Sequence, residues 1–288
     1  MDVLISGSEG FIGLNLVKNL LKKKINVEGL GRRKKKSSIN YKYFKYDLLN
    51  KKKFPKKLNK HYDVILHAAG LTSHSDIVNN KNFTKNSLKI SKKIYQLFSK
   101  TNSKHLIFLS SGKVYKNNKS KKINLKTKTN PNNKLGKTKL KIEKFLSSKI
   151  KKGKLTILRI FLVYGKNQNN KMLIPEILNQ IKKIKKKKQN NLFLGNLSVK
   201  RDFIFIDDLC KIIVENIFQI PKFKINIKNI ASGHSITPKE IALSLMKKYK
   251  INSEIIINKS KIRNDEPYIE KVYINKKTRN FYKCLKYL

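Results

Sequence analysis

The stretch that decides the fold is "DVLISGSEGFIG", residues 2–13. A short apolar run opens it, and Gly7, Gly10 and Gly13 follow at once. Glycines at this spacing let the backbone turn sharply out of a strand and approach a pyrophosphate closely. The helix that begins after the turn offers unpaired N–H groups to a phosphate. The stretch therefore predicts a dinucleotide-binding unit, and the alternative is a tight turn without a ligand.

Beyond this unit, short apolar runs alternate with helix-like segments. The runs lie at 25–30, 41–47, 62–70, 104–111 and 155–165, and helical patterns lie near 11–24, 80–101 and 134–150. This alternation predicts an α/β fold, a Rossmann-type doubly wound parallel sheet with helices on both faces. After residue 165 the alternation of predicted strands and helices becomes less regular. We therefore predict an NAD(P)-binding domain over 1–165, completed by 201–230, and a small C-terminal substrate-binding lobe that takes most of 166–288.

The end of the second predicted strand bears on the cofactor. An acid at this point recognises the ribose 2′-hydroxyl of NAD, whereas an arginine accommodates the 2′-phosphate of NADP. Here Gly31 stands at the position of the acid, and Arg32 and Arg33 follow it. The pattern predicts NADP rather than NAD. Asp47, which ends the third strand, could accept a hydrogen bond from adenine or could cap a helix.

The composition of the chain limits the kinds of binding partner that we expect. Lys and Arg number 68 against 17 Asp and Glu, a net charge of +51, yet only six of the 68 are Arg. We interpret this spread of lysine as a compositional bias, and expect no specific nucleic-acid partner. Cys210 and Cys284 lie far apart, so we expect a reducing, cytoplasmic location and no disulfide or metal site. The chain opens directly as a strand, so no signal peptide is expected. The longest apolar stretch is broken by Arg159 and is too short for membrane insertion.

Several segments, taken in order, resemble the extended short-chain dehydrogenase/reductases, the NAD(P)-dependent epimerase/dehydratase group that acts on nucleotide sugars. The matching segments are the glycine turn, "DVILHAAG" at 63–70, "FLSSGKVY" at 108–115, "LRIFLVYG" at 158–165, "RDFIFIDDL" at 201–209 and "NIASGHSIT" at 229–237. The resemblance implies an oxidoreductase or isomerase that moves hydride at a sugar carbon, with a role in surface-polysaccharide synthesis. It also implies a homodimer through the helices near 80–101 and 134–150.

The resemblance locates a catalytic helix in "NPNNKLGKTKLKIEKF", residues 130–145. Family members carry Tyr-x-x-x-Lys here, and Leu135 occupies the tyrosine position while Lys139 keeps the lysine. Ser111 matches the catalytic serine or threonine. Since leucine cannot move a proton, two readings stay open. The protein is an enzyme in which another group, such as Lys137, Lys113 or Tyr115, replaces the phenol, or it is an impaired member that binds without turnover.

The resemblance also implies a set of ligand contacts. The expected cofactor-binding residues are Gly7, Gly10, Phe11, Ile12, Gly13, Arg32, Arg33, Asp47, Leu48, His67, Ala68, Ala69, Asn86 and Lys139. His67 is expected to order the loop beside the cofactor and not to act as a base. Arg201 and Arg263 match positions that contact the diphosphate of a nucleotide sugar. Their alternative role is a surface ion pair with Asp202 or Asp265.

Overall fold

The computed structural model describes residues 1–33, 36–50, 52–71, 77, 80–115, 122–262, 271–275 and 277–288. The chain forms two compact units. The first comprises Met1–Lys116, Lys128–Ile160 and Cys210–Asn229, and the second comprises Asn117–Thr127, Phe161–Leu209 and Ile230–Leu288. Substrate binding by the second unit remains a prediction.

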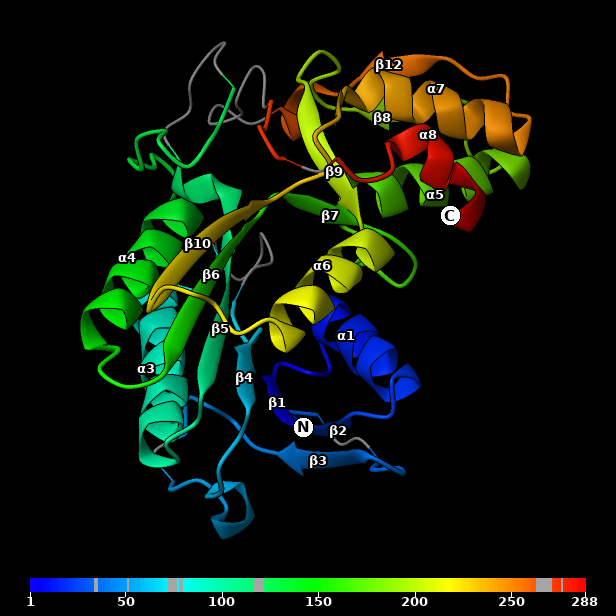
Figure 1. Ribbon diagram of the computed structural model, residues 1–288. Helices are drawn as coiled ribbons and strands as arrows, with labels where there is room; N and C mark the ends of the chain where they lie inside the picture. Colours follow the sequence, from blue (N-terminus) through cyan, green and yellow to red (C-terminus); the bar gives the residue numbers. More distant parts are fainter. Residues whose placement is uncertain are drawn as a thin grey trace. The chain divides into compact units, whose positions relative to one another are not determined.

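A seven-stranded sheet, in the order β10-β6-β5-β4-β1-β2-β3, is the centre of the first unit (Figure 1). Its strands are β1 (Asp2–Ser6), β2 (Asn26–Gly31), β3 (Tyr41–Lys45), β4 (Val64–His67), β5 (His105–Ser111), β6 (Lys154–Ile160) and β10 (Ile225–Ile230). All neighbours from β6 to β3 pair in parallel. The predicted fold class is confirmed. The strand order reverses between β1 and β4, and at such a point ligands bind outside the carboxyl ends of the strands.

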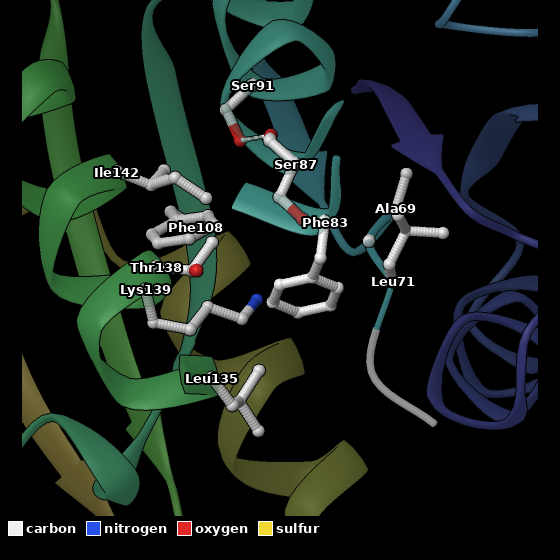
Figure 2. Close-up of a pocket in the computed structure, with 11 residues that line it drawn as sticks. Ala69, Leu71, Phe83, Ser87, Ser91, Phe108, Leu135, Thr138, Lys139 and Ile142 are labelled. Carbon is white, nitrogen blue, oxygen red and sulfur yellow. Dashed lines mark hydrogen bonds between the residues drawn. The ribbon is translucent and has the colours of Figure 1, made fainter. Parts of the chain in front are cut away.

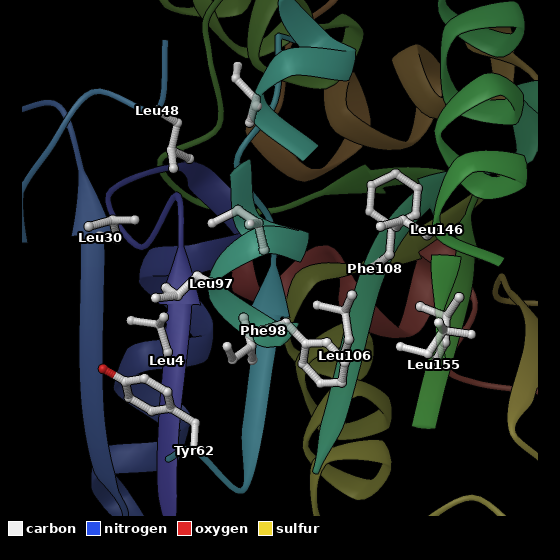
Figure 3. Packing of buried hydrophobic residues seen from close by; sticks show 14 of the residues in the cluster. Leu4, Leu30, Leu48, Tyr62, Leu97, Phe98, Leu106, Phe108, Leu146 and Leu155 are labelled. Atoms are coloured by element: carbon white, nitrogen blue, oxygen red, sulfur yellow. The ribbon is translucent and has the colours of Figure 1, made fainter. Parts of the chain in front are cut away.

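Helices cover both faces of this sheet. Figure 1 shows α3 (Phe83–Lys100) and α4 (Lys134–Lys149) on one face, and α1 (Phe11–Lys22) with α6 (Ile206–Phe218) on the other. In α3, positions 83, 87, 90, 91, 94, 97 and 98 are buried, which is the spacing of a helix with one face toward a core. Leu97 and Phe98 pack there against sheet residues such as Leu4 and Leu106 (Figure 3).

The second unit contains short sheets and helices. Its strands are β7 (Leu162–Tyr164), β8 (Leu192–Leu194), β9 (Arg201–Phe205), β11 (Ser235–Ile236) and β12 (Ile255–Ile257), and its helices are α5 (Leu173–Lys185), α7 (Pro238–Tyr249) and α8 (Phe281–Cys284). Strand β9 lies between β7 and β11, and β8 pairs with β12. Among the helices of the described ranges, none is long and apolar enough to cross a membrane.

Candidate functional site

The glycine turn between β1 and α1 forms a tight backbone cradle. Gly7 has a φ of +73°, and a Cβ placed on it would lie 2.8 Å from the Ala69 Cα atom. A Cβ on Gly13 would lie 2.2 Å from the Gly7 carbonyl oxygen, so no side chain fits there. Gly10 caps α1 without a side chain of its own. The helix N-terminus is thus left open to an anion, and the cradle fits the pyrophosphate of a dinucleotide.

His67, at the end of β4, joins the glycine turn to α3. Its Nδ1 lies 3.0 Å from the Ser6 Oγ and its Nε2 lies 2.9 Å from the Ser91 Oγ. The Ser6 Oγ also accepts from the Ala69 amide at 3.3 Å. Burial, with a smaller contribution from the charge of Lys139, lowers the pKa of His67 to about 3. The ring is therefore neutral at physiological pH and orders the backbone around residues 67–69.

The end of β2 holds a carboxylate that the sequence analysis missed. Glu9, inside the glycine turn, accepts from the Arg32 amide at 3.1 Å and from the Arg33 amide at 2.8 Å. The Tyr43 hydroxyl lies 2.9 Å from the Glu9 Oε2 and 2.6 Å from the Arg33 carbonyl oxygen, and its one proton is shared between these two acceptors. Burial disfavours the ionised form, but these donors outweigh burial and hold the pKa of Glu9 below its usual value. The signal available in the sequence was an acid inside the glycine motif.

The other predicted cofactor residues lie in different surroundings. Phe11 and Ile12 open α1 and are half-buried, and Ala68 donates its amide to the Ser6 carbonyl at 3.1 Å. Asp47 is exposed and accepts from the Leu49 amide at 2.9 Å, which makes it a turn residue rather than a helix cap. Leu48 belongs to the hydrophobic core, and Asn86 is half-buried in the first turn of α3.

A pocket lies between α3, α4 and the ends of β4 and β5. Its lining residues are Ala69, Gly70, Leu71, Phe83, Ser87, Ser91, Phe108, Leu135, Thr138, Lys139 and Ile142. Figure 2 shows Leu135 one helical turn from Lys139, with the lysine side chain reaching into the pocket. The expected pairing of positions 135 and 139 on one face of α4 is thus present. Phe83, Ser87 and Leu71 were not predicted, because aromatic, serine and leucine side chains at those positions carry no motif.

Lys139 is a buried cation in this pocket. Its Nζ donates to the Leu109 carbonyl at 2.8 Å and lies 4.8 Å from the centre of the Phe108 ring. Burial lowers the pKa of Lys139 to about 8, and the Glu143 carboxylate opposes that shift. The amine therefore changes its charge close to neutral pH.

Glu143 lies one turn beyond Lys139 and is part of a buried network. It accepts from the Arg159 NH2 at 2.7 Å and from the Ser110 hydroxyl at 2.5 Å. Arg159 also donates to the Tyr115 hydroxyl at 3.0 Å, and that hydroxyl donates to Asn229 at 2.7 Å. These contacts fix α4 against β5 and β6. They also give Tyr115 a structural place outside the pocket lining.

Two other candidate residues lie close to α4 in sequence or space. Ser111 ends β5 and accepts from the Lys113 amide at 3.2 Å, which caps the short helix that follows. Lys137 is exposed on α4, so it does not line the pocket. Ser87 does line it, and the buried Ser87 hydroxyl has no hydrogen-bond partner among the described residues.

The predicted diphosphate contacts belong to the second unit. Arg201 is the first residue of β9, where it pairs with Ile236. Asp202, its alternative ion-pair partner, accepts instead from the Ser232 amide at 2.6 Å and the Gly233 amide at 2.8 Å. Arg263 lies outside the described residues, as does its alternative partner Asp265.

A parallel sheet with a glycine cradle at its switch point defines a Rossmann-type nucleotide-binding protein. The model of the NAD dependent epimerase/dehydratase family matches residues 3–227. The chain belongs to this family, as the sequence motifs predicted.

Individual relatives agree with this assignment. GDP-6-deoxy-D-talose 4-dehydrogenase of Aggregatibacter actinomycetemcomitans is 26% identical over 274 residues, which are 93% of this chain and 85% of that protein. The structure of MoeE5 in complex with UDP-glucuronic acid and NAD has a TM-score of 0.86 at 18% identity, over 100% of this chain and 97% of that one. UDP-glucuronic acid 4-epimerase from Bacillus cereus, in complex with UDP-glucuronic acid and NAD, has a TM-score of 0.85 at 22% identity, with the same coverages. At these identities the two structures show a shared fold.

Proposed function

We propose that this protein is an NAD(P)-dependent enzyme that moves hydride at a sugar carbon of a nucleotide sugar, as an epimerase or a reductase. The observation that carries the proposal is that Ala69 belongs to both halves of the site. Its backbone closes over Gly7 of the glycine cradle, and it lines the same pocket as Lys139. A dinucleotide held by the cradle would thus extend toward a buried amine.

The residues that would hold the cofactor come from two places. The glycine turn would hold the pyrophosphate, and Lys139 would contact the ribose beside the nicotinamide. When bound, the nicotinamide supplies or accepts the hydride. Arg32 and Arg33 favour NADP, whereas the two solved relatives above were determined with NAD. The choice depends on groups at the end of β2.

Lys139 is proposed to take over the proton transfer that a tyrosine would perform. With a pKa of about 8, roughly a tenth of the amine is neutral at pH 7, so both forms are populated. The neutral amine can accept a proton from a sugar hydroxyl, and the ammonium can return it. Ser111 would donate a hydrogen bond to the same sugar oxygen.

The second candidate function is binding without turnover. It is favoured by Leu135, an apolar side chain in the pocket where proton transfer is required. Lys139 already donates to the Leu109 carbonyl, which supports a purely structural or ribose-holding role. Under this proposal the protein would hold a dinucleotide and a nucleotide sugar in a regulatory role.

The test is a spectrophotometric assay at 340 nm. The purified protein is mixed with each nicotinamide dinucleotide and a panel of UDP- and GDP-sugars with their 4-keto forms. A steady change in absorbance with any sugar supports the enzyme. Tight nucleotide binding by calorimetry without any absorbance change, and without epimer formation by chromatography, supports the binding protein.

The remaining elements of the proposal follow from the resemblance. Arg201 and Arg263 are proposed to bind the diphosphate of the sugar nucleotide, since guanidinium groups suit phosphates. The outer surfaces of α3 and α4 are proposed to form a homodimer, which sedimentation would test. Surface-polysaccharide synthesis is the proposed pathway, because nucleotide sugars are its building blocks.

A further inference from the structure

We infer that Glu9 is the carboxylate that recognises the adenosine ribose, so that the protein selects NAD over NADP. The inference rests on the proposed function and departs from the preference for NADP that Arg32 and Arg33 suggest. In NAD-binding Rossmann folds an acid at the end of the second strand accepts a hydrogen bond from the ribose 2′-hydroxyl. Gly31 stands at that position here, and the carboxylate comes from the glycine turn instead.

Glu9 fills the space that an acid on Gly31 would need. A Cβ on Gly31 would lie 2.8 Å from the Glu9 Cδ and 2.7 Å from the Tyr43 hydroxyl. Tyr43 reaches across Gly31 from β3 to donate to Glu9. The absence of a side chain at position 31 is therefore a condition for this arrangement. The carboxylate at this point belongs to the turn, and Gly31 on the strand leaves the space that it occupies.

The contacts of Glu9 leave room for one more donor. Its Oε1 accepts from the Arg32 amide, and its Oε2 accepts from the Arg33 amide and the Tyr43 hydroxyl. A carboxylate has about four acceptor sites, so Oε1 can also accept a ribose hydroxyl. The lowered pKa keeps Glu9 ionised at neutral pH. A 2′-phosphate, with a charge of about −2, would be repelled at the same place.

The structure fixes the backbones of Arg32 and Arg33 rather than their side chains. Both amides are used by Glu9, and both side chains are exposed. An exposed arginine is screened by water and salt, whereas the carboxylate is held in place by two backbone amides and lies beside the Tyr43 hydroxyl. The fixed charge at the end of β2 is negative.

The test compares binding of NADH and NADPH by calorimetry, using full-length protein. We expect the wild-type protein to bind NADH at least tenfold more tightly than NADPH. Glu9→Gln keeps the shape of the side chain and removes its charge. This substitution should lower the preference for NADH at least tenfold, mainly by increasing the affinity for NADPH. Glu215→Gln, which removes the same charge from an exposed position on α6, should leave the preference within twofold of the wild-type value.

The outcomes separate the inference from the proposed function. An equal or greater affinity of the wild-type protein for NADPH, or an unchanged preference in folded Glu9→Gln, would overturn the role of Glu9 and leave the proposed function intact. If neither nucleotide binds, both fail. If a thermal melt shows that Glu9→Gln does not fold, a displacement experiment on the wild-type protein still tests the preference for NAD. ADP-ribose should then displace NADH at a concentration at least tenfold lower than ADP-ribose 2′-phosphate does, and equal displacement would refute the inference.

Discussion

Two parts of the candidate site differ from what the resemblance leads one to expect, and their surroundings differ as well. At the end of β2, the missing acid at Gly31 is replaced by Glu9, which enters from the neighbouring turn. In the pocket of α4, the apolar Leu135 lies beside Lys139, at the position where the resemblance predicts a tyrosine. At the end of β2 a carboxylate is present, supplied by another segment. In the pocket a group of different chemistry, Lys139, is proposed to move the proton.

The difference shows how space decides which replacements are available. Gly31 opens a gap that a side chain from another segment can enter, because it has no Cβ. Leu135 fills its own place, so no second side chain can take that position. The proposed role of Lys139 depends instead on its surroundings, because burial lowers the pKa of Lys139 to about 8.

The largest expected effect concerns Lys139, the proposed proton-transfer group in the pocket. Lys139→Met keeps the length of the side chain and removes its amine. Turnover should fall by roughly 10²–10⁴-fold, the usual value of a positioned acid or base. Steady-state kinetics measure it, with Lys137→Met on the exposed side of α4 as the matched control. If Lys139→Met keeps more than a tenth of wild-type turnover, Lys139 is not the proton-transfer group.

The dependence of turnover on pH tests the same proposed role of Lys139. In the direction that oxidises the sugar, neutral Lys139 must accept a proton. The rate should therefore rise about tenfold per unit of pH below the pKa of about 8, and become level above it. In the reducing direction the ammonium donates, so the rate should fall above pH 8. A rate that does not change between pH 6 and pH 9 in either direction would argue against this assignment.

A third experiment restores the lost residue. Leu135→Tyr should raise turnover about tenfold, since a phenol near a lysine is the family's own proton-transfer pair. Leu135→Phe is the matched control, because it adds the same ring without the hydroxyl and should give no increase. Equal effects of the two substitutions would mean that packing, rather than proton transfer, limits the reaction.

The smallest expected effect concerns the support of Glu9. Tyr43→Phe removes the hydroxyl that donates to the Glu9 Oε2 at 2.9 Å and leaves the two amide donors in place. The preference for NADH over NADPH should fall only two- to fivefold, in keeping with the loss of one neutral donor. Tyr41→Phe, which loses a contact to the Ser8 hydroxyl instead, should leave the preference unchanged in the same calorimetric titration.

Much of the first unit could be predicted from the sequence because its signals are local. The glycine turn, the apolar strands and the helical spacing of α3 and α4 each depend on residues close together in the chain. The adjacency of Leu135 and Lys139 also followed from helix geometry. Leu48 belongs to the core, and its predicted contact with the cofactor stays a prediction.

The role of Glu9 could not be predicted, because it depends on contacts between residues more than twenty positions apart. Nothing in residues 7–13 indicates that Tyr43 will cross over Gly31 and meet the turn. The buried network of Glu143, Arg159 and Tyr115 was missed for the same reason. It joins α4, β6 and the segment after β5, and only the pairing of β5 with β6 brings these together.

The crossing of Tyr43 over Gly31 has a consequence for protein engineering. Cofactor preference is commonly altered by changing the residue at the end of β2, but an aspartate at position 31 would collide with both Glu9 and Tyr43. Positions 9, 31 and 43 are therefore coupled, because a side chain at position 31 requires the ends of the Glu9 and Tyr43 side chains to move. A library that varies one of them at a time would reject substitutions that are acceptable in combination.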